Sequence, residues 1–129
     1  MLTKNENSLI VSKPDYLQLI KLIEQYDTPA AEALDIELGR ADIVNPQDIP
    51  TDTVTMGSIV TFIDMDSSEE NTVSLVYPAD ANVAQMKISV LSPVGSALIG
   101  LRIGGHIDWP IPQGKVRRLK VIAVQQPSE

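Results

Sequence analysis

Residue types that carry enzyme chemistry are scarce in this sequence. The chain has no cysteine and a single histidine, His106, which directly follows two glycines. Metal centres and nucleophile–base pairs need several such groups converging on one point. The glycines within residues 100–105 match neither the P-loop nor the dinucleotide-binding fingerprint. We therefore expect no catalytic residue, no metal centre and no cofactor, and we interpret His106 as an incidental surface residue.

Acidic residues form two groups that allow a structural and a functional interpretation. The stretch 64–71 carries four acids, which could hold a divalent cation, although loop acids of this kind usually face water. Glu24, Asp27 and Glu32 are close together in the first part of the chain. They form either a solvated turn with helix-capping charges or an acidic tip that is presented to a partner.

The charge of the chain argues against nucleic acid as a partner. The formal net charge is −7, and residues 1–50 carry nine acids against four bases. Affinity for phosphates comes from clustered Lys and Arg. One basic cluster is present, and strand alternation would divide it between two faces: Lys115, Arg117, Arg118 and Lys120. We expect no direct nucleic-acid binding, whereas the acidic first part suits a basic protein surface.

Targeting features are missing from the sequence. No apolar run approaches the roughly 18 residues needed to cross a membrane. The polar residues 1–7 lack the apolar core of a secretory signal. Without cysteines the chain forms no disulfides. We expect a cytoplasmic protein that does not bind membranes.

Two helix start signals follow one another near the beginning of the chain. Ser12 occupies an N-cap position before Pro14, and Thr28 precedes Pro29 in the same way. Apolar residues at helical spacing follow each signal. The pattern predicts two antiparallel helices of about 13–15 residues, each roughly 20 Å long, joined by a short turn. Because helices this short are marginal alone, we expect them to pack on each other and on the rest of the chain.

The prolines of Asn45-Pro46 and Ile49-Pro50 mark a boundary, and we divide the chain into 1–48 and 49–129. Beyond it the pattern predicts strands at 58–63, 72–77, 87–91, 106–111 and 116–124, with a turn at 112–114. The imperfect alternation of the last strand indicates either a bulge or burial of both faces near its end. Ser92 followed by Pro93 starts a short helix that Gly100 ends. The fold class is α+β: a helical hairpin, then an antiparallel sheet domain with one short helix.

Three stretches resemble a known family. The stretch 46–58 resembles the signature that enters the second domain of the Rnk family, named as regulators of nucleoside diphosphate kinase, and 75–79 resembles a further block. The stretch 88–101, which contains Ser92-Pro93-Val94-Gly95, looks like the motif that Rnk proteins share with the Gre-type transcript cleavage factors. The similarity runs in order from about residue 28 to residue 124.

This resemblance implies an N-terminal antiparallel coiled coil and a C-terminal FKBP-like domain. In Gre-type factors the globular domain docks at the rim of the secondary channel of RNA polymerase, and acidic residues at the coiled-coil tip reach the catalytic magnesium. The implied function is a transcription regulator that binds RNA polymerase and competes with Gre-type factors. Ser92 and Pro93 carry over as docking residues, although a helix cap alone would also explain them. A hairpin of roughly 20 Å would keep Glu24 and Asp27 from the metal, so no transcript cleavage is expected.

Two other functions stay open beside this one. The family name implies a protein that regulates nucleoside diphosphate kinase, and the sequence does not separate direct binding from an indirect effect. An FKBP-like domain also invites peptidyl-prolyl isomerase activity, which needs a concave pocket lined with aromatic side chains. The chain has one Trp (Trp109), one Phe (Phe62) and three Tyr, two of which fall in the predicted hairpin. We therefore rank isomerase activity last and predict that the protein is not an enzyme.

Overall fold

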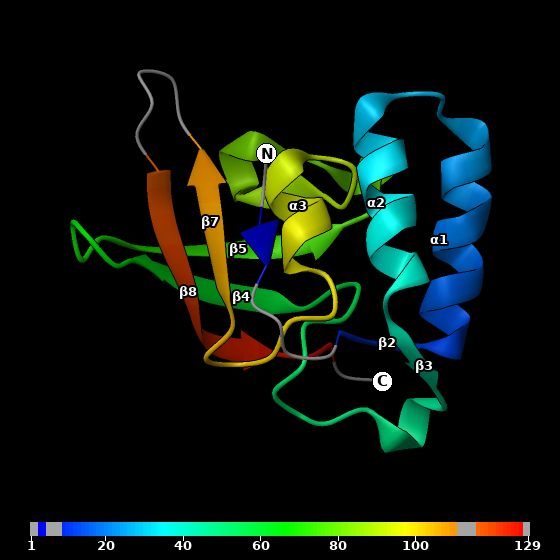
Figure 1. Ribbon diagram of the computed structural model, residues 1–129, viewed down its shortest axis with the longest axis horizontal. Coiled ribbons are helices and arrows are strands. Elements are labelled where there is room, and N and C mark those ends of the chain that lie inside the picture. Colours follow the sequence, from blue (N-terminus) through cyan, green and yellow to red (C-terminus); the bar gives the residue numbers. More distant parts are fainter. Residues whose placement is uncertain (1–2, 5–8, 111–115, 128–129) are drawn as a thin grey trace.

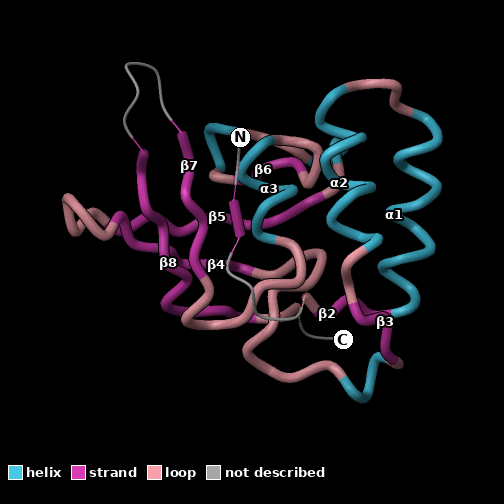
Figure 2. The backbone as a smooth tube through the Cα atoms, viewed as in Figure 1, coloured by secondary structure: helices cyan, strands magenta, loops and turns pink. Residues whose placement is uncertain are grey.

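The computed structural model describes residues 3–4, 9–110 and 116–127, and it places a pair of helices beside a curled sheet (Figure 1). α1 spans Lys13–Gln25, α2 spans Pro29–Gly39 and α3 spans Pro93–Leu98. α2 lies between α1 and α3, and α3 covers one face of the sheet. The segment between β3 and β4 runs mostly as loop along the end of the molecule opposite the α1–α2 connection (Figure 2). The chain therefore has the predicted mixed α+β architecture.

The main sheet has six strands in the order β1-β7-β8-β4-β5-β6. Their bounds are β1 Thr3–Lys4, β4 Ile59–Asp64, β5 Glu70–Val76, β6 Lys87–Ser89, β7 His106–Pro110 and β8 Val116–Gln125. Each of the five predicted strand segments overlaps one of the strands β4 to β8, with ends that differ by at most two residues. The predicted bulge in β8 is confirmed, because Thr61 pairs with Ala123 whereas Phe62 pairs with Val121. The predicted turn at 112–114 lies outside the described residues.

The sheet is not wholly antiparallel, so the expected sheet type is wrong at one edge. β6 pairs with β5 in parallel, with Leu75 opposite Ile88. Parallel neighbours cannot be joined by a tight hairpin. The connecting segment instead carries the chain back through two 3₁₀ turns, Pro78–Asp80 and Val83–Gln85. A pattern of apolar residues predicts that β6 is a strand, but it does not predict its direction.

Both helices of the pair begin at the predicted caps. Ser12 Oγ accepts a hydrogen bond from the Asp15 amide at 3.3 Å, and Thr28 Oγ1 accepts one from the Ala31 amide at 3.1 Å. α1 has 13 residues and α2 has 11, so α2 is shorter than predicted. At 1.5 Å per residue the helices are roughly 20 Å and 17 Å long. No helix in the described ranges is long and apolar enough to cross a membrane.

Two short strands at the base of the helical pair were not predicted, and neither was β1. β2 (Ile10–Ser12) precedes α1 and pairs in parallel with β3 (Asp42–Val44), which follows α2. Next to β2, the Leu9 carbonyl accepts a hydrogen bond from the Asp42 amide at 2.7 Å. The Ile10 amide donates to the Gly100 carbonyl at 3.2 Å. These bonds tie the base of the helical pair to the segment that follows α3.

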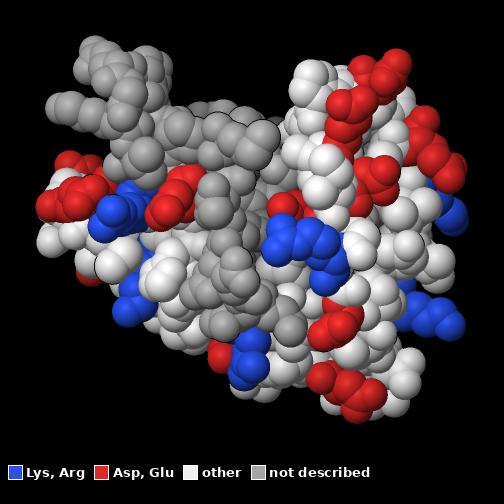
Figure 3. Space-filling model, in the orientation of Figure 1, with Lys and Arg blue, Asp and Glu red and all other residues white. Residues whose placement is uncertain are grey.

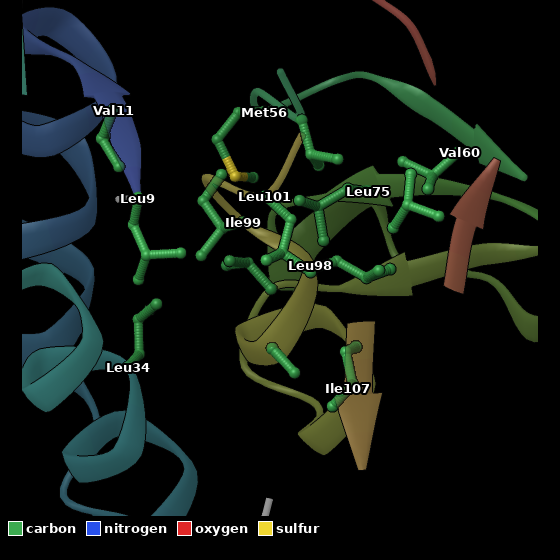
Figure 4. Packing of buried hydrophobic residues seen from close by; sticks show 14 of the residues in the cluster. Leu9, Val11, Leu34, Met56, Val60, Leu75, Leu98, Ile99, Leu101 and Ile107 are labelled. Carbon is green, nitrogen blue, oxygen red and sulfur yellow. The ribbon is translucent and has the colours of Figure 1, made fainter. Parts of the chain in front are cut away.

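In the described part of the chain, one hydrophobic cluster joins the helical pair to the sheet (Figure 4). Leu34 of α2 is fully buried in this cluster, together with Leu98 and Ile99 at the end of α3. The same cluster continues to Leu75 of β5 and Ile107 of β7. The core therefore crosses the predicted boundary between residues 48 and 49.

α3 lies so close to β6 that Gly95 has no room for a side chain. A Cβ at this position would overlap the carbonyl oxygen of Ser89 and lie 3.0 Å from Ser92 Oγ. Because the overlapped atom belongs to the backbone, a side-chain rotation cannot relieve the overlap. The approach of α3 to β6 therefore depends on glycine at position 95.

We predict that Gly95→Ala lowers the free energy of unfolding by about 2–3 kcal/mol, because the methyl group forces α3 away from Ser89. Gly39→Ala is the matched control, since a Cβ added at Gly39 would have no atom within 4 Å. That variant should change stability by less than about 1 kcal/mol. Urea denaturation of both variants measures the difference. Equal effects of the two substitutions would contradict the described packing of α3.

Candidate functional site

Ser92 begins α3 at a corner where the chain leaves β6. Its Oγ donates to the Ser89 carbonyl oxygen at 2.7 Å and accepts from the Gly95 amide at 3.0 Å. The Ser92 amide donates to the same carbonyl at 2.9 Å, and the Leu91 amide donates to Ser89 Oγ at 3.0 Å. Together with the close approach of Gly95, these bonds hold residues 89–95 as a rigid corner. We call these residues the α3 corner.

The cap role predicted for Ser92 is confirmed, and Pro93 occupies the first turn of α3. The single O–H of Ser92 is used within the corner, so its hydroxyl can meet a partner only as an acceptor through its remaining lone pair. Ser92 is half-buried. The α3 corner therefore offers a partner mainly a fixed shape. Docking through Ser92 and Pro93 stays a prediction.

Glu24 and Asp27 lie at the free end of the helical pair. Glu24 is in the last turn of α1, Asp27 lies in the connection to α2, and both are exposed. Acidic side chains gather over this end of the molecule in Figure 3. Glu24 does not act as a helix-stabilising charge, because the C-terminal end of a helix favours cations. The structure thus brings both residues to one exposed tip, while their role toward a partner stays a prediction.

Asp64 has a structural role that the sequence did not reveal. Its Oδ1 accepts hydrogen bonds from the Asp66 amide at 2.9 Å and the Ser67 amide at 3.2 Å. Its Oδ2 pairs with Arg117 Nε at 2.9 Å. The Asp66 amide first, and then Arg117, lower the pKa of this buried carboxyl below its usual value. Asp64 therefore closes its own turn and holds that turn against β8.

The basic cluster is divided, as alternation predicts. Arg117 pairs with Asp64, whereas Arg118 and Lys120 are two residues apart on β8 and share the opposite side of that strand. Lys115 lies outside the described residues. The three residues of this cluster that the structure describes therefore form no continuous basic surface.

His106 is half-buried at the start of β7 and makes an interaction within the chain. With Met65, Asp108 and Arg118 it lines a cavity of about 260 Å³. Among the residues that the structure describes, no three His, Asp or Glu side chains converge as a metal centre would require. Phe62, one of the few aromatic residues of the chain, belongs to the buried core.

Sequence reasoning missed the junction where α1 meets the segment between β3 and β4. Asp15 lies in the first turn of α1, and its Oδ2 accepts a hydrogen bond from the Met56 amide at 3.3 Å. Burial raises the pKa of Asp15, and the hydrogen bonds from Met56 and Ser12 oppose the rise only in part. Burial and the charge of Asp15 together raise the pKa of Tyr77 to about 12. Because 41 residues separate Asp15 from Met56, no local pattern could have revealed the contact.

Two further contacts hold this junction in place. Gln126 Nε2 donates to the Pro50 carbonyl at 2.8 Å and to the Thr53 carbonyl at 2.9 Å. Asp52 Oδ1 pairs with Arg102 Nε at 2.9 Å. The loop between β3 and β4, which faces the first turn of α1, is therefore held by Gln126 on one side and by Arg102 on the other.

Comparison with known families matches both parts of the chain. Residues 7–44 match the family described as "Rnk N-terminus", and residues 49–126 match the family described as "Transcription elongation factor, GreA/GreB, C-term". The regulator of nucleoside diphosphate kinase from Escherichia coli K12 is 37% identical over 125 residues, which cover 95% of this chain and 92% of that protein. The transcription elongation factor GreA of Syntrophotalea carbinolica is 38% identical over 81 residues, or 63% of this chain and 51% of that protein.

Solved structures agree with this result. A transcription elongation factor GreA/GreB from Nitrosomonas europaea superposes with a TM-score of 0.80 at 42% identity, and the match covers 93% of this chain and 99% of that one. The Gfh1 protein of Thermus aquaticus gives a TM-score of 0.53 at 27% identity, covering 92% and 98%. The α3 corner lies inside the segment that matches the elongation factor family.

We predict that Ser92→Ala lowers the free energy of unfolding by about 1–2 kcal/mol, because it removes the cap of α3 and the bond to the Ser89 carbonyl. Ser92→Thr keeps the hydroxyl and should cost less than half as much. Thermal unfolding of the two variants beside the wild type measures the difference. If Ala and Thr were equally tolerated, the hydroxyl would not be holding the corner.

We also predict that replacing Asp15 changes the pH dependence of stability. Folding raises the pKa of Asp15 above its unfolded value of about 3.9. Between these two pKa values the folded state binds the proton more tightly than the unfolded state does. Ionisation of Asp15 therefore lowers stability as pH rises through this window. Asn at this position can still accept the Met56 hydrogen bond but carries no charge.

The stability of the wild type relative to Asp15→Asn should accordingly increase as pH is lowered from 7 to 4. Chemical denaturation at several pH values gives the two curves. Asp48→Asn removes the same charge from an exposed position and controls for net charge. A constant difference between wild type and Asp15→Asn across this range would show that Asp15 is not desolvated.

Proposed function

This chain belongs to the Rnk family, whose C-terminal part is shared with the GreA and GreB transcription elongation factors, and we propose that it regulates transcription by binding RNA polymerase. The proposed docking place is the rim of the secondary channel. In this proposal the protein competes there with Gre-type factors, in the cytoplasm, and catalyses no reaction itself. The observation that carries the proposal is the match of residues 49–126 to the elongation factor family.

The α3 corner is the docking element in this proposal. It belongs to the matched segment, and internal hydrogen bonds hold it in the isolated chain. A preformed corner loses little conformational entropy on binding, which favours affinity from a small surface. Ser92 and Pro93 are therefore the residues that we assign to the contact.

The finer architecture of the proposal follows the same family. The helical pair is a short antiparallel coiled coil, the sheet with α3 is an FKBP-like domain, and the boundary between the two units lies at residues 48 and 49. The continuous core supports a fixed arrangement of these units rather than a flexible link. A fixed arrangement lets the docked domain aim the helical pair.

The length of the helical pair supports binding without transcript cleavage. The two helices reach roughly 20 Å and 17 Å from their base. The 81 residues that match the GreA factor of Syntrophotalea carbinolica cover 51% of that protein. We propose that the tip formed by Glu24 and Asp27 enters the channel and excludes other factors but stays short of the catalytic metal.

Direct regulation of nucleoside diphosphate kinase is the second candidate. The name of the Escherichia coli relative, at 37% identity over 95% of this chain, favours it. The exposed acidic tip offers a surface for a protein partner in this case as well. The two candidates separate experimentally, because one predicts a complex with RNA polymerase and the other a complex with the kinase.

We predict that the protein at micromolar concentration associates with core RNA polymerase and that a Gre-type factor displaces it. Fluorescence anisotropy of the labelled chain measures both steps. The same titration with nucleoside diphosphate kinase tests the second candidate. Failure to bind the polymerase, or binding that a Gre-type factor leaves unchanged, would contradict docking at the rim.

We predict that Pro93→Ala weakens polymerase binding by roughly 30-fold, corresponding to about 2 kcal/mol for a central contact. Its cost in stability should be only about 1 kcal/mol, because proline in a first helical turn acts mainly by adding rigidity. The control carries Glu24→Gln and Asp27→Asn at the tip. If Pro93→Ala binds like the wild type while the tip variant does not bind, the helical pair is the anchor and the α3 corner is not.

We predict that saturating protein does not shorten the transcripts of backtracked polymerase complexes. A stalled-complex assay with a Gre-type factor as positive control measures this directly. Shortened transcripts that disappear with Glu24→Gln or Asp27→Asn would mean that the tip reaches the catalytic metal.

A further inference from the structure

A cavity of about 320 Å³ lies at the junction between the first turn of α1 and the loop that follows β3. We call it the seam cavity. Its walls come from three parts of the chain and combine polar with apolar side chains. The polar ones are Ser12, Asp15, Thr55 and Gln126, and the apolar ones are Pro14, Pro46, Ile49, Met56 and Pro127.

The charge of the seam cavity is one-sided. Among the described residues that line it, Asp15 alone carries a charge, and neither Lys nor Arg is present. The carboxylate accepts a hydrogen bond from the Met56 amide at 3.3 Å, near the long end of the normal range. Burial dominates over this bond and raises the pKa of Asp15. The ionised carboxylate is therefore less well stabilised here than in water.

A ligand that fits this cavity must combine a cation with an apolar stem. The cation would supply the countercharge that the cavity lacks, and the stem would lie against the prolines, Ile49 and Met56. Arginine suits the site better than lysine, because its guanidinium is more weakly hydrated and pairs with a carboxylate through two parallel hydrogen bonds. We propose that the seam cavity binds an arginine side chain of a protein partner, with Asp15 receiving the guanidinium.

A second groove explains why the arginine should come from a protein segment. A groove of about 430 Å³ along α1 shares the lining residues Pro14 and Pro46 with the seam cavity, so the two are neighbours. Leu17, which is 52% exposed, lies in this groove, and Lys13 and Lys21 flank it one helical turn away on either side. A chain anchored by its arginine can therefore continue over Leu17 with an apolar residue and reach the lysines with acids. A free amino acid would use only the first half of this surface.

This proposal does not depend on the polymerase docking described above, because it involves different residues and is tested without polymerase. The probe is N-acetyl-arginine amide, titrated into the full-length protein and followed by the backbone amide signals in nuclear magnetic resonance. We expect saturable shifts in the millimolar range, centred on Asp15 and Met56. The matched neutral compound, N-acetyl-citrulline amide, should bind at least tenfold more weakly. Equal binding of both compounds, or no saturable shift, would overturn the proposal.

The Asp15→Asn variant tests the role of the carboxylate. Asn retains an oxygen for the Met56 amide, so the seam should keep its shape while losing its charge. We expect at least a tenfold loss of affinity for the arginine compound and no change for the citrulline compound. Asp48→Asn is the control, since Asp48 is exposed and does not line the cavity. The proposal is wrong if the Asp15 and Asp48 variants bind the arginine compound equally well while the native spectrum is preserved.

The source of the arginine is tested with blocked peptides and with free arginine. The peptide carries an arginine, two glycines, a leucine and two glutamates, and it is made in both orders. One order should bind at least tenfold more tightly than N-acetyl-arginine amide, and Lys13→Gln with Lys21→Gln should remove that gain. If free arginine binds more tightly than either peptide, the ligand is a small metabolite. The proposal that the arginine belongs to a protein partner would then be wrong.

Discussion

The helical pair depends on burial against the rest of the chain, because helices of 13 and 11 residues are marginal on their own in water. Leu34 of α2 is completely buried in the same cluster as Leu98 of α3. The place of α3 is in turn set by Gly95, which lies against the Ser89 carbonyl without space for a methyl group. This close approach of two backbone segments, together with the bond from the Ile10 amide to the Gly100 carbonyl, places the helical pair relative to the sheet. Any function that uses the pair and the sheet together depends on this approach.

Much of the fold could be predicted from the sequence where the signals are local. Ser12 and Thr28 are helix caps as predicted, and the strand segments lie where apolar runs indicate them. β2 and β3 were missed because three residues are too few to show a period. The parallel direction of β6 was missed because direction depends on the path of the connecting segment and not on the composition of the strand.

The difference between local and long-range signals also applies to the candidate sites. The start of α3 could be predicted because its signal, Ser92 followed by Pro93, is local. The contacts made by Asp15 and Asp64 were not visible, because their partners Met56 and Arg117 lie 41 and 53 residues away. Helix caps and turn acids are common in sequences, so residue type and position alone assign both aspartates to those roles. Only the packed structure shows which aspartate also has a long-range contact.

Asp15 and Asp64 have opposite pKa shifts because their surroundings differ. Asp64 receives two backbone amides and the guanidinium of Arg117, so its charge is stabilised and its pKa is lowered. Asp15 has hydrogen bonds from Met56 and Ser12 but no cation among the described residues that line its cavity, and burial raises its pKa. An asparagine could make the Met56 bond without the cost of a buried charge. A residue that lowers stability where a neutral one would suffice indicates a functional constraint. Arg117 compensates the charge of Asp64 within the chain, and for Asp15 the proposed arginine of a partner would do the same.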